Sequence, residues 1–96
     1  MILTIDVGNT NITCGVFDGD VIVASFRITT KMPRTSDEYG MILYNLLEQN
    51  NIQPMDIGDA IICSVVPNVM HSLRGGLVKY SHIIAIIVEE GIKTGI

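Results

Sequence analysis

The chain has 96 residues, of which 48% are hydrophobic and only 17% are charged, and its formal net charge is −4. This length predicts a single domain with a core of its own. The acidic balance and the scattered basic residues argue against nucleic-acid binding, because phosphate backbones require a basic surface. No apolar run approaches the roughly 20 residues that span a membrane, and the first residues lack the basic start of a signal peptide, so we expect a cytoplasmic protein.

The low proportion of charged residues has two interpretations. A typical soluble domain carries about 25% charged residues. The additional apolar residues in this chain either belong to a parallel sheet that is buried on both faces, or form a face that is covered by chain outside these 96 residues. The composition leaves both interpretations open.

The first 28 residues predict three antiparallel strands. Apolar segments rich in β-formers occupy residues 2–7, 12–17 and 21–28. Asp18-Gly19 separates the second segment from the third, and Asp-Gly between two apolar runs is a strong hairpin signal.

A helix is predicted to begin next to Thr35. Thr35 and Glu38 have the spacing of a capping box, in which each side chain bonds the other residue's backbone N–H. Apolar residues then recur at helical spacing as far as Asn50. Gly40 costs about 1 kcal/mol relative to alanine inside a helix, so its presence predicts close packing at this position.

The second half of the chain predicts a strand, a helix and a further strand. Residues 60–66 form a continuous apolar run, and Pro67 suits the first position of a helix. Gly75-Gly76 makes the later half of that helix doubtful. Residues 83–88 are again continuously apolar, as expected for a strand covered on both faces. The order βββαβαβ predicts an α/β fold with a mixed five-stranded sheet, in which the last two strands extend the sheet beside the first strand and helices flank its faces.

The turn after the first strand is the segment most informative about function. Asp6 ends the strand, and Gly8, Asn9, Thr10 and Asn11 follow it. Glycine lets the backbone approach a bulky anion, exposed N–H groups bind phosphate oxygens, and a carboxylate beside them suits a magnesium ion held against the phosphates. An ordinary Asn/Gly-rich hairpin turn with a solvated aspartate explains the same residues. The segment is not a P-loop, because nothing matches GxxxxGK[ST].

Four segments, in this order and spacing, resemble type III pantothenate kinase. They are Ile2-Leu3-Thr4-Ile5-Asp6-Val7-Gly8-Asn9-Thr10-Asn11, Arg34-Thr35-Ser36-Asp37-Glu38-Tyr39-Gly40, Ser64-Val65-Val66-Pro67 and Gly91-Ile92-Lys93-Thr94-Gly95. The resemblance implies a ribonuclease H-like, actin-like ATPase fold built from two halves. Residues 1–96 would be the N-terminal ATP-binding half-domain, and the C-terminal half would be absent.

The resemblance also implies site residues. The ATP phosphates would be bound by Asp6, Val7, Gly8, Asn9, Thr10, Asn11, Ile12 and Thr13. Asp6 would lie near the magnesium. No catalytic residue is expected in this chain, because the family's general-base aspartate would lie beyond Ile96, as would the residues that contact pantothenate.

The implied reaction is the ATP-dependent phosphorylation of pantothenate to 4'-phosphopantothenate, the first step of coenzyme A synthesis. ATP, Mg²⁺ and a monovalent cation, K⁺ or NH₄⁺, would be needed, and the full-length protein is expected to be a cytoplasmic homodimer. The fragment alone is expected to be inactive. Two alternatives stay open: a kinase of the same fold that acts on a sugar or on acetate, and a non-enzymatic accessory protein in transcription.

The remaining candidate residues have structural explanations. Cys14 and Cys63 lack the spacing of a zinc or redox motif and are expected to be free thiols. His71 and His82 have no spaced partner for a metal. Ser64 ends a strand but has no nearby base that would make it a nucleophile.

Overall fold

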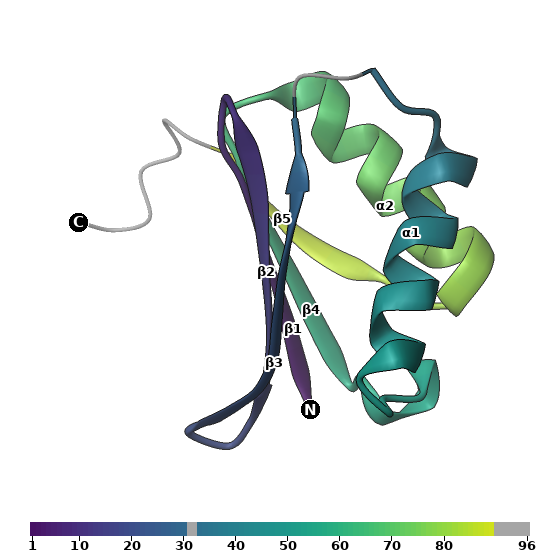
Figure 1. Cartoon of the computed structure of the whole chain (residues 1–96). Coiled ribbons are helices and arrows are strands. Elements are labelled where there is room, and N and C mark those ends of the chain that lie inside the picture. The colour runs from purple at the N-terminus through teal and green to yellow at the C-terminus, as the bar shows by residue number, and fades with distance from the viewer. Residues whose placement is uncertain (31–32, 90–96) are drawn as a thin grey trace.

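A computed structural model describes residues 1–30 and 33–89, which form one five-stranded sheet and two α-helices (Figure 1). The strand order is β3-β2-β1-β4-β5. The elements are β1 Ile2–Val7, β2 Asn11–Asp18, β3 Val21–Thr29, α1 Ser36–Gln49, the short 3₁₀ helix η1 Pro54–Asp56, β4 Asp59–Ser64, α2 Pro67–Ser81 and β5 Ala85–Glu89. The predicted mixed sheet and its element order are confirmed. The similarity to the closing segment 91–95 falls outside the described residues.

The first three strands form the predicted antiparallel meander. β1 pairs with β2 from Ile2↔Phe17 to Val7↔Ile12, and β2 pairs with β3 with a register shift between Val16 and Phe17. Gly19 has a positive φ of 62° in the connecting turn, a conformation that glycine adopts without steric cost. β4 pairs parallel to β1, and β5 pairs parallel to β4.

Both helices lie on the same face of the sheet, as Figure 1 shows. β3, β4 and β5 are parallel to one another, so α1 and α2 are both crossover connections between parallel strands. Each connection moves toward the β5 edge. Because such crossovers are right-handed, two that move in the same direction place their helices on the same face.

The expectation of strands buried on both faces is therefore wrong for this chain. β4 alternates between buried and exposed residues, and in β5 Ala85 is buried whereas Ile86 is 62% exposed. Ile84, just before β5, is 76% exposed. No described element covers the face away from the helices, so the apolar residues there remain in contact with solvent. We call this surface the open face.

The core lies between the sheet and the two helices. The largest of its fully buried side chains are Tyr39, Leu3, Ile5, Ile12, Leu43, Leu47, Ile62, Met70, Leu73, Leu77, Val7 and Val16. They come from alternate positions of the strands and from helical positions three or four residues apart, which are the two periodicities that place side chains on one face.

The capping box predicted for α1 is present. The Glu38 backbone N–H donates to the Thr35 hydroxyl at 3.2 Å, and the Thr35 backbone N–H donates to the Glu38 carboxylate at 2.8 Å. Two of the N–H groups at the start of the helix that would otherwise lack partners are therefore satisfied.

α2 continues through Gly75-Gly76 to Ser81, so the expected weakness of its second half is not observed. The glycines allow α1 and α2 to approach closely. A Cβ on Gly76 would lie 2.6 Å from the Gly40 nitrogen, and a Cβ on Gly40 would lie 2.8 Å from the Gly76 carbonyl oxygen. The predicted close packing at Gly40 is thereby confirmed, and the contact with α1 compensates for the low helix propensity of the two glycines.

Two strand boundaries differ from the prediction by a few residues. β4 ends at Ser64, because the Ser64 hydroxyl bonds both the backbone N–H and the carbonyl of Val66 at 2.8 Å and turns the chain into α2. β5 begins at Ala85, because the Ile83 N–H donates to the Leu77 carbonyl and completes the end of α2. His82 has a φ of 56° there, the left-handed conformation that commonly ends helices.

Among the described residues, no helix is both long and apolar enough to cross a membrane.

Candidate functional site

The turn between β1 and β2 is narrow and is held by a backbone hydrogen bond. The Gly8 N–H donates to the Asn11 carbonyl at 2.9 Å. A Cβ on Gly8 would lie 3.2 Å from that same carbonyl oxygen, which is tighter than most Cβ contacts. Glycine therefore fits this position better than a residue with a side chain, and the turn presents backbone instead of bulk to a ligand.

Two contacts anchor the turn to its neighbours. The Thr30 N–H, just after β3, donates to the Thr10 carbonyl at 2.9 Å. The Val65 N–H, just after β4, donates to the Val7 carbonyl at 3.2 Å. The ends of β3 and β4 thus hold the turn in place, and little reorganisation would be needed when a ligand binds.

Polar groups of the turn are free to meet a ligand. Asn9 and Thr10 are exposed, and neither backbone N–H has a backbone partner within the described part of the chain. Successive unpaired N–H groups in a tight turn form a concave surface that attracts anions. The geometry of the turn therefore suits phosphate oxygens.

The candidate residues divide between the two faces of the sheet. Val7 and Ile12 are 1% and 0% exposed and belong to the core, so only their backbone could contact a nucleotide. Asp6 and Thr13 are exposed on the open face and are direct register partners. The alternation of a β-strand explains this division, because successive side chains point to opposite faces.

Asp6 is suitably placed to hold a magnesium ion. Its carboxylate is exposed at the end of β1, beside the Thr13 position and close to the turn. Magnesium usually binds one or two carboxylates together with substrate phosphates and keeps several waters, so a full set of protein ligands is not required. The described ranges 1–30 and 33–89 contain no group of three or more His, Cys, Asp or Glu side chains that could hold a metal by themselves.

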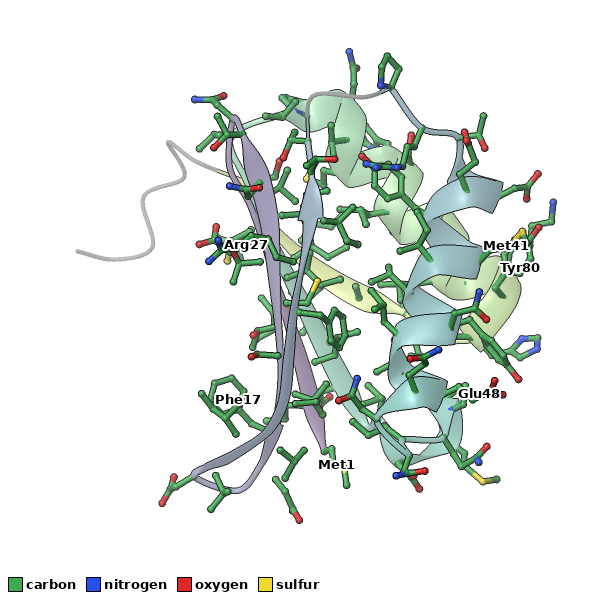
Figure 2. All side chains as sticks on the ribbon, viewed as in Figure 1. Met1, Phe17, Arg27, Met41, Glu48 and Tyr80 are labelled. Carbon is green, nitrogen blue, oxygen red and sulfur yellow. The ribbon has the colours of Figure 1, made fainter. Side chains whose placement is uncertain are left out.

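Sequence reasoning missed two residues that flank the Asp6–Thr13 pair on the open face. Cys63 is the register partner of Asp6 on β4, and Arg27 is the register partner of Thr13 on β3. Arg27 and Thr13 line a hollow of about 250 Å³, and Figure 2 shows Arg27 on the side of the sheet away from the helices. The alternation within residues 21–28 would have indicated the face of Arg27 once the register was known.

The weaker candidates have structural roles in the described residues. Ser64 is 7% exposed, and its hydroxyl is occupied by the turn into α2, so it has no geometry for nucleophilic attack. Arg34 is half-buried and donates to the Thr29 carbonyl and, at 3.2 Å, to the Thr29 hydroxyl. These two hydrogen bonds hold the Arg34 guanidinium against the end of β3.

Two kinds of sequence comparison agree. The family model described as type III pantothenate kinase matches residues 2–96. A type III pantothenate kinase of Agathobacter rectalis is 76% identical over the whole chain, and one of Bifidobacterium longum is 53% identical over 95 residues. The chain spans about 37% of the length of each of these curated relatives.

Solved structures with low sequence identity share the fold. An ROK hexokinase from Thermus thermophilus superposes with a TM-score of 0.62 at 13% identity, covering 93% of this chain and 33% of the hexokinase. RuvC from Thermus thermophilus superposes with a TM-score of 0.56 at 8% identity, covering 92% of this chain and 63% of RuvC. These similarities establish the architecture of the sheet and helices and nothing about chemistry.

Proposed function

The chain belongs to the type III pantothenate kinase family, and from this premise we propose that it forms the ATP phosphate-binding part of an enzyme that phosphorylates pantothenate. The family match over residues 2–96 carries the proposal. The turn at Gly8, with its exposed N–H groups and the adjacent Asp6 carboxylate, supports it independently of the match.

Each part of the turn has a proposed task. The N–H groups of Asn9 and Thr10 donate to phosphate oxygens, and Gly8 allows the backbone to approach them. The hydroxyl of Thr13 adds a donor on the open face. Magnesium, when it is bound by Asp6 and the phosphates, would neutralise the charge that develops on the transferred phosphoryl group. The residues present fit this arrangement without any further protein ligand.

Residues 1–96 are proposed to supply one wall of the cleft. The relatives are much longer than this chain, and we propose that the general base and the pantothenate pocket lie in the part that the chain does not span. In-line phosphoryl transfer depends on holding acceptor, phosphate and metal together, so one wall alone would forfeit most of the rate enhancement. The expected homodimer and the requirement for K⁺ or NH₄⁺ remain predictions from the resemblance.

A chimera provides the test. This chain replaces the matching segment of the Agathobacter rectalis relative, which is 76% identical to it and supplies the remaining length. We expect pantothenate-dependent ADP release from the chimera and none from the 96-residue chain alone. Glucose and acetate serve as alternative acceptors. A chimera that folds but prefers either of them to pantothenate would contradict the proposed acceptor. Pantothenate-dependent turnover by the 96-residue chain would contradict the proposal that the general base and the pantothenate pocket lie outside it.

A further inference from the structure

A second cavity lies beside the turn proposed to bind phosphate, between the end of β3, the start of α1 and the first turns of α2. Its volume is about 270 Å³. The polar side chains that line it are Thr30, Arg34, Tyr39, Asn68 and Ser72. None of the residues proposed to bind ATP belongs to this lining, so the cavity is separate from the turn even though Thr30 bonds Thr10 through its backbone.

Two buried hydroxyls at this cavity have no hydrogen-bond partner among the described residues. They are the Thr30 Oγ1 and the Tyr39 hydroxyl, and the whole Tyr39 side chain is only 1% exposed. A buried hydroxyl without a partner is costly, and such groups are rare in native proteins. Both residues line the cavity, so an acceptor bound there would lie next to the residues whose hydroxyls lack partners.

The charge around the cavity is positive. The Arg34 guanidinium lies 5.7 Å from the centre of the Tyr39 ring and has no carboxylate within ion-pair distance in the described part of the chain. Two of its N–H groups bond Thr29, which leaves three of its five donors for a ligand. No aspartate or glutamate lines the cavity.

The N-terminus of α2 contributes to the same potential. Val66 at the N-cap provides no side-chain hydrogen bond, and no acidic residue lies in the first turn. The N–H groups of Asn68 and Val69 therefore have no capping side chain from Val66, and they lie at the positive end of the helix dipole. Both residues line the cavity.

We propose that this cavity is an oxyanion-binding site, which takes a carboxylate or a phosphate group. Three independent features meet there in the described part of the chain: an arginine without a counter-ion, an uncapped helix N-terminus and two hydroxyl donors without acceptors. Each of these features favours an oxyanion, whereas the arginine and the positive end of the helix dipole disfavour a cation. The inference goes beyond the proposed function and does not depend on it.

The test uses the 96-residue chain with inorganic phosphate and with acetate as separate probes, at constant ionic strength. Binding should raise the thermal unfolding temperature, because a ligand that binds only the folded chain stabilises it. In ¹⁵N spectra, saturable shifts at the Asn68 and Val69 amides locate the ligand in the cavity, and shifts at Asn9 and Thr10 report the separate turn. A response to phosphate alone or to acetate alone would support the site and show whether it takes a phosphate or a carboxylate group.

Two variants and a control decide the outcome. Arg34→Gln removes the charge and should weaken binding at least about tenfold, since charge-assisted hydrogen bonds are the strong ones. Tyr39→Phe should weaken binding without lowering the unfolding temperature of the free chain, because it removes a hydroxyl that has no partner. Arg74→Gln, an exposed arginine outside the lining, should change nothing. The proposal fails if neither probe shifts Asn68 and Val69, or if the two cavity variants bind as the control does.

Discussion

Asp6 and Thr13 are directly paired across β1 and β2, and Cys63 occupies the position on the other side of Asp6 in β4. All three side chains are exposed on the open face. A thiol therefore lies one strand away from the proposed magnesium ligand, where it can report on what binds there.

The two cysteines should differ sharply in reactivity. Cys63 is exposed, whereas Cys14 is 1% exposed and its burial raises the pKa of the thiol to about 12. The thiolate is the reacting species, so at pH 8 an alkylating reagent should modify Cys63 and leave Cys14 untouched until the chain unfolds. Mass spectrometry of the native and the denatured chain counts the modified thiols.

The same reagent tests the site. In the chimera, ATP with magnesium should slow alkylation of Cys63, because the ligand would cover the neighbouring strand end. Magnesium alone serves as the control. Alkylation of Cys14 in the native chain would contradict its burial in the core, and an unchanged rate at Cys63 with ATP and magnesium would contradict the proposed site on the open face.

Local signals predicted much of this fold, because they depend on few residues. The capping box at Thr35 located the start of α1, and Asp18-Gly19 located a hairpin. The sequence left open whether one face of the sheet is uncovered, because continuous apolar runs show that a strand can be buried on both faces but not which face the crossover helices cover. The direction of the two crossovers determines that face.

The turn residues of the site could be identified from the sequence, but the residues that lie beside them in the fold could not. The turn from Gly8 to Asn11 stands out in the sequence, whereas Arg27 and Cys63 become its neighbours only through strand register. The cavity at Tyr39 could not be predicted from the sequence either, because it depends on the packing of α1 against α2. Tyr39 is 1% exposed at the start of α1, but nothing in the sequence indicates that its hydroxyl lacks a partner among the described residues.

The close contact between α1 and α2 predicts a specific loss of stability. Gly76→Ala would place a Cβ 2.6 Å from the Gly40 nitrogen, and helix backbone cannot yield as a flexible side chain can. Overpacking of this kind costs about 1–3 kcal/mol, so the free energy of unfolding in urea should fall by that amount.

Gly58→Ala is the matched control for this substitution. The nearest atom to a Cβ there, the Met1 carbonyl oxygen, is 4.0 Å away, and Gly58 does not have a positive φ. The change should be neutral or slightly stabilising. Equal free energies of unfolding for the two variants would show that α1 and α2 have room for a Cβ at Gly76.

The open face predicts self-association of the 96-residue chain. Ile84 and Ile86 are 76% and 62% exposed on or beside β5, and larger contiguous apolar patches favour association. Sedimentation should show a mass that rises with concentration, and Ile86→Lys should lower it. Met55→Lys changes an 87% exposed residue in η1, away from the sheet, and should have no such effect. A wild-type chain that stays monomeric would contradict the prediction.

The most direct test of the proposed function is the turnover of the chimera carrying Asp6→Asn, which keeps the size of the side chain and removes its charge. Because several kcal/mol of charge stabilisation would be lost, kcat should fall by about a hundredfold or more at saturating ATP and magnesium. Asp20→Asn, an exposed aspartate in the β2–β3 turn at the opposite end of these strands, is the control and should keep full activity. Both variants should unfold at the temperature of the parent chimera. A rate for Asp6→Asn equal to that of Asp20→Asn would contradict the account, because Asp6 would then be only a solvated residue at the end of a strand.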